Sequence, residues 1–214
     1  MKKILPLLLL SALSAEESAS YDVKSVSEAF GRLIYQNFSC LDVPFDVEQI
    51  AQGIKNAAAG VEEVITEEEC VSAIHVEQQN NFKARRDTNL QEANAFLDAN
   101  AKKEGVVCLA DGKVQYQQLA QGSGNVVKAH SSPLLRYTFR CKGLNGSEVC
   151  QSNIEEPLDL DCAMEGLTVG ITGMKEGEKR ILHIHPDLGY GEKGLDVFLP
   201  NILLTYEVEV LKAN

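Results

Sequence analysis

The sequence has no tryptophan and is poor in proline and in basic residues. Its 214 residues include 20 Lys and Arg against 31 Asp and Glu, which gives a formal net charge of −11 at pH 7. Nucleic acids and anionic membrane surfaces attract proteins through a basic footprint, so this balance argues against both as partners. The apolar residues, 44% of the chain, are enough to bury a hydrophobic core in one or two domains.

The N-terminus has the order of a secretory signal peptide. Lys2 and Lys3 precede a run of apolar residues at 4–10, and small residues follow. The run is too short to cross a bilayer as a helix, and no cysteine lies near the cleavage point, after Ser14 or Ala15, to carry a lipid anchor. Residues 1–15 therefore predict a periplasmic or otherwise extracytoplasmic protein, and leave open whether it associates with the outer membrane or is released.

Proline is absent between Phe45 and Ser132, and helices are predicted over much of that stretch and just before it. Capping signals mark three helix starts: the capping box SVSE at residues 25–28, Asp46, and TEEE at residues 66–69. Apolar residues at helical spacing follow the first two starts. These two short helices make too small a core alone, so a second copy of the chain is the expected cover.

The third helix extends without a breaker to about Asn100, and its middle, residues 78–92, is polar nearly all round. A helix of this kind is typical of a solvated arm between two bodies. We therefore expect residues 21–65 to be a helical dimerisation module and residues 66–104 to be a long connecting helix.

From Gly105 onward the pattern changes to strands and turns, with one short helix at residues 162–172. This order predicts an α+β fold in which a small antiparallel sheet packs on one helix. The predicted strands cover residues 106–109, 114–119, 134–141, 179–184 and 203–211.

One pair of the six cysteines has a pairing signal. Asn145-Gly146 is a strong two-residue hairpin turn, and counting outward from it places Cys141 opposite Cys150. In a non-hydrogen-bonded pair the Cα atoms lie about 4.5 Å apart, which allows a disulfide bridge. Two reduced cysteines are the alternative.

The two histidines of HIHPDLGYG, His183 and His185, could start a metal site, but a zinc site needs three or four ligands. The other histidines, His75 and His130, are isolated, so we interpret the pair as one face of a strand and predict no metal. A Ser-His-Asp hydrolase is also disfavoured, because no G-x-S-x-G motif occurs.

Five short motifs follow one another in the second half: GKVQY at residues 112–116, GSG at 122–124, LRYT at 135–138, GMKEGEKR at 173–180 and PDLGYG at 186–191. In sequence, order and spacing they resemble an FKBP-type peptidyl-prolyl isomerase domain, here at residues 105–214. The helical first half resembles the dimerisation module and connecting helix of the Mip subgroup of exported bacterial FKBPs.

The resemblance implies rotation about an X-Pro amide, a reaction that needs no nucleophile, metal or cofactor. It makes Tyr190, Tyr137 and Met164 the catalytic residues: the Tyr190 hydroxyl and the Met164 backbone N–H donate to substrate carbonyls, and Tyr137 lies beside the proline. It places further substrate-binding residues around the proline at Val149, Cys150, Leu158, Ala163, Leu167, Phe198 and Tyr206.

Several positions depart from the family pattern. Val149-Cys150 stands where Phe-Asp is usual, Leu167 where tryptophan is common and Glu165 where proline is usual. We therefore expect a homodimeric isomerase that assists the folding of exported, proline-containing polypeptides with reduced activity, and that binds macrolide inhibitors weakly. The alternative is a non-catalytic, Mip-like dimeric chaperone that binds unfolded clients.

Overall fold

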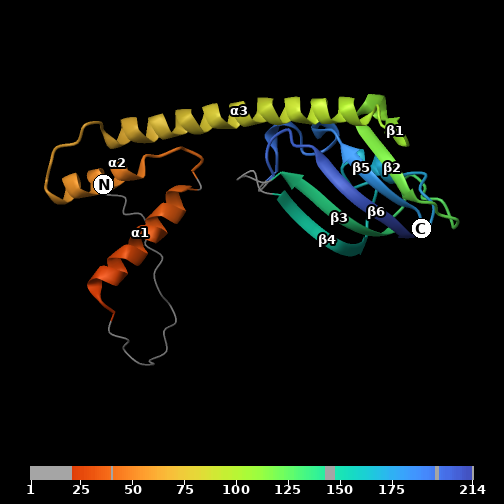
Figure 1. Cartoon of the computed structure of the whole chain (residues 1–214), viewed down its shortest axis with the longest axis horizontal. Coiled ribbons are helices and arrows are strands. Elements are labelled where there is room, and N and C mark those ends of the chain that lie inside the picture. Colours follow the sequence, from red (N-terminus) through yellow and green to blue (C-terminus); the bar gives the residue numbers. More distant parts are fainter. Residues whose placement is uncertain (1–20, 40, 143–147, 196–197, 214) are drawn as a thin grey trace. The chain divides into compact units, whose positions relative to one another are not determined.

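The computed structural model describes residues 21–39, 41–142, 148–195 and 198–213. The chain forms two compact units that divide between Glu62 and Glu63. The first unit contains helices α1 (Val23–Ser39) and α2 (Val47–Ala58), and the second contains helix α3 (Glu67–Asn100) and all the strands (Figure 1).

Helix α1 begins two residues before the predicted capping box, because Asp22 supplies the cap: its carboxylate accepts a hydrogen bond from the Ser25 N–H at 3.3 Å. Helix α2 begins as predicted, with the Asp46 carboxylate accepting from the Glu48 and Gln49 N–H groups. No residue of α1 or α2 is buried in the single chain. Their apolar stripes are therefore exposed.

Helix α3 begins with the predicted capping box of Thr66 and Glu69 and runs for 34 residues. Its buried residues all lie in the C-terminal part, at Asn89, Ala93, Leu97 and Asn100. The Asn89 side chain donates to the Pro200 carbonyl at 2.7 Å. The solvated-arm interpretation therefore does not extend to the end of α3, whose last turns pack on the sheet through amide hydrogen bonds.

The sheet is antiparallel and has six strands in the order β1-β2-β5-β6-β3-β4. The α+β class is confirmed, and the five predicted strands agree with the structure to within one residue at each end. The sixth strand, β4, is an edge strand for which the sequence predicts only a hairpin that places Cys150 opposite Cys141, without bounds for the strand. The strands are β1 (Val106–Leu109), β2 (Val114–Ala120), β3 (Leu134–Lys142), β4 (Glu148–Pro157), β5 (Lys179–Ile184) and β6 (Leu204–Lys212).

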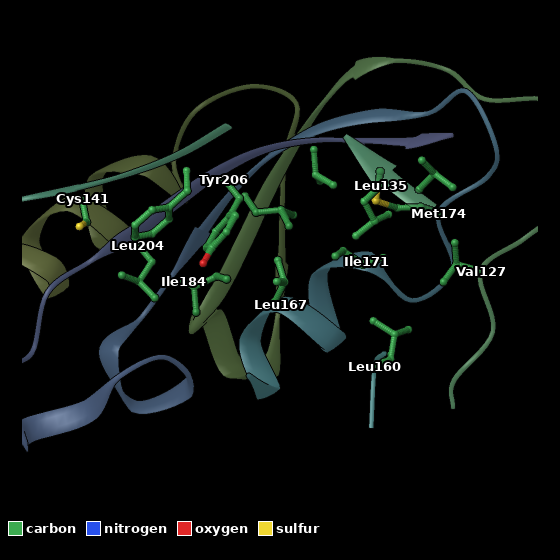
Figure 2. Packing of buried hydrophobic residues seen from close by; sticks show 14 of the residues in the cluster. Val127, Leu135, Cys141, Leu160, Leu167, Ile171, Met174, Ile184, Leu204 and Tyr206 are labelled. Carbon is green, nitrogen blue, oxygen red and sulfur yellow. The ribbon is translucent and has the colours of Figure 1, made fainter. Parts of the chain in front are cut away.

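Helix α4 (Glu165–Ile171) packs on one face of the sheet, where Leu167 and Ile171 point toward buried side chains of the strands (Figure 2). A glycine is required at position 166, because a Cβ there would overlap the Ile184 side chain. Side chains alternate along β5, so His183 lies on the opposite face, where its ring contacts Phe96 of α3. The sheet is therefore covered by α4 on one face and by the end of α3 on the other.

The predicted disulfide is not present. Strand β4 pairs one residue out of the predicted register, so Cys141 lies opposite Val149 and Cys150 lies opposite Arg140. Cys141 is buried, Cys150 is exposed, and both are free thiols. A one-residue shift turns a side chain to the other face of the sheet, which separates the two sulfur atoms. The turn residues 143–147, including Asn145-Gly146, lie outside the described residues.

Candidate functional site

Five aromatic side chains meet on the α4 face of the sheet. Tyr137 and Phe139 come from β3, Tyr206 from β6, and Tyr190 and Phe198 from the segment between β5 and β6. Ring centroids are 5.9 Å apart for Tyr137–Tyr206 and 4.9 Å for Phe139–Tyr206. Tyr190 and Phe198 are stacked at 4.6 Å. Tilted and stacked pairs at these distances are favourable aromatic contacts, so the rings form one packed cluster.

The cluster has a buried floor and a more open rim. Phe139 and Tyr206 are only 3% and 6% exposed, whereas Tyr137, Tyr190 and Phe198 are half-buried. From α4 and the chain before it, Leu167, Met164 and Leu158 pack against the same core. The predicted residues Tyr137, Tyr190, Tyr206, Phe198, Leu167, Met164 and Leu158 are thus brought together around an apolar surface.

The phenol groups of Tyr190 and Tyr206 influence each other's titration. Burial is the main cause that raises the pKa of both phenols, and the neighbouring Tyr190 raises the pKa of Tyr206 further. Both phenols therefore stay protonated at neutral pH, and the half-buried Tyr190 lies at the rim of the cluster.

The Tyr137 hydroxyl is committed to a carboxylate. It donates to Glu156 Oε1 at 2.6 Å, and burial followed by this bond raises the pKa of Tyr137. Glu156 lies on β4 opposite Leu135, two residues from Tyr137 along β3, and so shares a face with both.

A backbone donor lies at the start of α4. Met164 is the N-cap residue, and its carbonyl accepts from the Leu167 and Thr168 N–H groups at 3.1 Å each. Within the described ranges no protein group accepts a hydrogen bond from the Met164 N–H itself. Its neighbour Ala163 is half-buried and bonds through its own N–H to the Asp159 carbonyl.

The two predicted residues after the hairpin are placed differently. Cys150 lies opposite Arg140, on the sheet face away from Phe139 and Cys141, and its sulfur is 3.3 Å from the Ser152 hydroxyl. It does not line the aromatic cluster, because of the one-residue register shift. The Val149 backbone pairs with Cys141, and its side chain lies outside the described part of the chain.

Two members of the site were missed from the sequence. Phe139 is two residues from Tyr137, and the period-two pattern of the strand would have identified it. Glu156 gave no such signal, because its approach to Tyr137 depends on how β4 pairs with β3.

His183 and His185 both contact side chains of helix α3. His185 is buried, its Nε2 lies 3.1 Å from Asn94 Oδ1, and its Nδ1 accepts from the Asp187 N–H. Burial lowers the pKa of His185. Among the described residues no group of three or more His, Cys, Asp or Glu side chains could hold a metal ion.

A cavity of about 440 Å³ lies between α3 and the sheet, lined among others by Phe96, Ala93 and Ile202. Its charged lining side chains pair with one another, Lys142 with Glu92 at 2.9 Å and Arg140 with Glu148 at 3.5 Å. The aromatic cluster is the better candidate for chemistry, because it combines an apolar surface with tyrosine hydroxyl groups at its rim.

A six-stranded antiparallel sheet packed on one short helix, with tyrosines around an apolar floor, defines a prolyl isomerase of the FKBP class. Residues 125–211 match the family model of the FKBP-type peptidyl-prolyl cis-trans isomerase, and residues 23–117 match that of the domain amino terminal to it. The chain belongs to the FKBP-type peptidyl-prolyl isomerase family.

Its relatives include the peptidyl-prolyl cis-trans isomerase Mip of Chlamydia muridarum, which is 34% identical over 203 residues (93% of this chain and 82% of the relative). The crystal structure of FkpA from Escherichia coli is similar in fold, with a TM-score of 0.71 at 23% identity over 88% of this chain and 93% of that chain. A peptidyl-prolyl isomerase from Pseudomonas syringae matches 58% of this chain and 92% of its own at a TM-score of 0.52 and 29% identity. No helix among the described residues is long and apolar enough to cross a membrane.

Proposed function

We propose that this protein catalyses cis-trans isomerisation of X-Pro bonds in exported polypeptides, with an activity reduced by its altered site. The barrier to rotation is about 18–20 kcal/mol because the C–N bond is partly double, and uncatalysed X-Pro interconversion takes tens to hundreds of seconds. A catalyst has to bind the twisted amide better than either planar form. An apolar surface with hydrogen-bond donors at its edge can do this.

The observation that carries the proposal is the aromatic cluster itself, in which the half-buried Tyr190 is stacked on Phe198 beside the buried rings of Phe139 and Tyr206. A proline ring packed on Tyr206 and Phe139 is shielded from water. The Tyr190 hydroxyl then donates a hydrogen bond to a carbonyl of the bound peptide. The Met164 N–H is a second donor at the edge of the same surface. Proton transfer is not required, because rotation about the C–N bond neither forms nor breaks a covalent bond.

Two features of the site support a reduced activity: the side chain at position 167 on the floor of the cluster and the orientation of Cys150 on β4. Leu167, only 6% exposed, offers an aliphatic rather than an aromatic surface, and Cys150 faces away from the site. Proline and macrolide inhibitors should therefore bind weakly.

Proline-limited refolding of a test protein examines the activity. Wild type should accelerate the slow phase and Tyr190→Phe should lose most of that effect. The matched control is Tyr116→Phe: its ring packs on the same hydrophobic core and lies 3.9 Å from the Arg180 guanidinium, and among the described residues it makes no ring contact with the five aromatic side chains of the cluster. An unchanged slow phase with wild type would rule out the isomerase function.

Exposed apolar residues on the first unit favour a second function, a dimeric chaperone. Phe30 and Leu33 of α1 and Ile54 of α2 are 60%, 54% and 56% exposed, more than a free helical unit in water would leave uncovered. We propose that residues 21–65 form a homodimer through these helices and that the dimer holds unfolded clients outside the cytoplasm. Sedimentation should give a dimer for the mature chain and a monomer after removal of residues 21–65. Suppressed aggregation of a client without acceleration of its refolding would favour the chaperone over the enzyme.

A further inference from the structure

Glu156 is a carboxylate in direct contact with the rim of the aromatic cluster. Its Oε1 accepts the Tyr137 hydroxyl proton at 2.6 Å. The next residue back, Glu155, lies on the other face of β4 and pairs with Arg136 at 3.0 Å. Two adjacent glutamates of one strand thus have separate partners, one on the site face and one on the outer face.

The β3–β4 pairing explains why Glu156 reaches Tyr137. A register irregularity lies between Tyr137 and Phe139, so that Tyr137 pairs with Ile154 while Phe139 pairs with Gln151. Beyond it, Leu135 lies opposite Glu156. Tyr137 and Glu156 therefore share a face in diagonal positions, which long side chains can bridge.

The hydrogen bond adds a directed polar contact to a ring that packs against the hydrophobic core and is only half-buried. Among the described residues the only aromatic ring within packing distance of Tyr137 is Tyr206, at 5.9 Å, and Tyr137 is half-buried. A bond from a phenol to a carboxylate is short and roughly twice as strong as a neutral one. It holds the half-exposed ring in one position before a peptide arrives, which lowers the ordering cost of binding.

We propose that Glu156 is a positioning residue that fixes the Tyr137 ring against the bound proline. Because the Tyr137 hydroxyl donates its proton to the hydrogen bond with Glu156, Tyr137 contributes only its ring to binding, and Tyr190 donates to the substrate carbonyl. This inference rests on the proposed isomerase function. It assigns different tasks to the two rim tyrosines.

The test compares Glu156→Gln and Glu156→Ala with the matched control Glu155→Gln, using a proline-containing peptide substrate and measuring kcat and KM. Loss of one hydrogen bond to a charged group at a partly exposed site should lower kcat/KM about three- to tenfold, chiefly through KM. Glu155→Gln should match wild type. In a Tyr137→Phe background the Glu156 substitutions should have no further effect, because the hydroxyl they act on is already gone.

A second readout is independent of activity. Alkaline titration of the tyrosines by NMR, with the Tyr137 signal assigned from Tyr137→Phe, should show a lower pKa for Tyr137 in Glu156→Gln than in wild type. An active wild type with Glu156→Gln equal to Glu155→Gln would overturn the inference and leave the isomerase standing. If wild type is inactive, the proposed function fails, and an unchanged Tyr137 titration in Glu156→Gln would overturn the contact as well.

Discussion

Mild acid should destabilise the second unit through His183. This ring is packed edge-on against Phe96 at 4.7 Å between centroids, and its Nδ1 lies 3.1 Å from the Thr205 hydroxyl. Burial, with a smaller contribution from the charge of Lys103, lowers the pKa of His183 from 6.5 to about 4. The unfolded chain therefore binds a proton at a higher pH than the folded chain. Stability contributed by the neutral ring is present above pH 6.5 and is lost as the pH falls toward 4.

The magnitude follows from the size of that shift. A change from 6.5 to about 4, at about 1.36 kcal/mol per pKa unit, corresponds to at most about 3.4 kcal/mol. His183 is only partly buried, so solvent screening reduces the effect. Between pH 7 and pH 5 we expect a loss of about 1 kcal/mol in the free energy of unfolding.

Urea unfolding at pH 7 and pH 5 measures this loss. The chain has no tryptophan, so near-UV circular dichroism of the tyrosines is a suitable signal. His183→Gln cannot titrate and can still bond to Thr205, and should lose about 1 kcal/mol less than wild type over this range. The control His75→Gln, at an exposed position of α3, should follow wild type. Equal pH dependence of wild type and His183→Gln would refute the assignment, because carboxylates that titrate in the same range are common to all three proteins.

Three further substitutions test packing and the site. Gly166→Ala should lower the free energy of unfolding by about 1–3 kcal/mol, because the new methyl overlaps the Ile184 side chain of β5. The control Gly31→Ala has open space around it in α1 and should not be destabilising. Equal melting temperatures for the two variants would contradict the close packing at Gly166. Tyr206→Phe removes the buried hydroxyl beside Tyr190 but keeps the ring, so peptide kcat/KM should fall severalfold with little change in unfolding. Full activity would show that the Tyr206 hydroxyl does not orient Tyr190. The Gln115 side chain donates to the Leu97 carbonyl of α3 at 2.9 Å. Gln115→Leu removes this donor and should lower the free energy of unfolding in urea by about 1–3 kcal/mol. No measurable loss would mean that the end of α3 is held by other contacts.

Local patterns in the sequence were enough to predict most of the fold. Alternating side chains defined five strands, and the caps at Asp46 and Thr66 were read correctly. The packing of α3 was not predictable in this way, because it uses buried asparagines where an apolar stripe would have been visible. Asn89 and Asn100 have the composition of a solvated helix face, yet both are hydrogen-bonded and buried.

The members of the aromatic cluster that lie in short sequence motifs could be predicted from the sequence. Tyr137 and Tyr190 lie in short conspicuous motifs, and the structure brings both to the cluster. The disulfide and the placement of Cys150 failed for one reason: the register was counted from an assumed two-residue turn, and β4 pairs one residue away from that count. Glu156 depends on the same long-range pairing, which no local pattern encodes.

The buried end of α3 determines where the chain can be cut. A truncation that begins at residue 105, where the strands start, would remove the partners of Gln115 and His185 and uncover the sheet face that Phe96 covers. A shortened protein that begins ahead of Arg86, whose carbonyl accepts from Asn201, retains these contacts. The smallest stably folded fragment that contains the aromatic cluster should therefore carry about half of the long helix as a structural part.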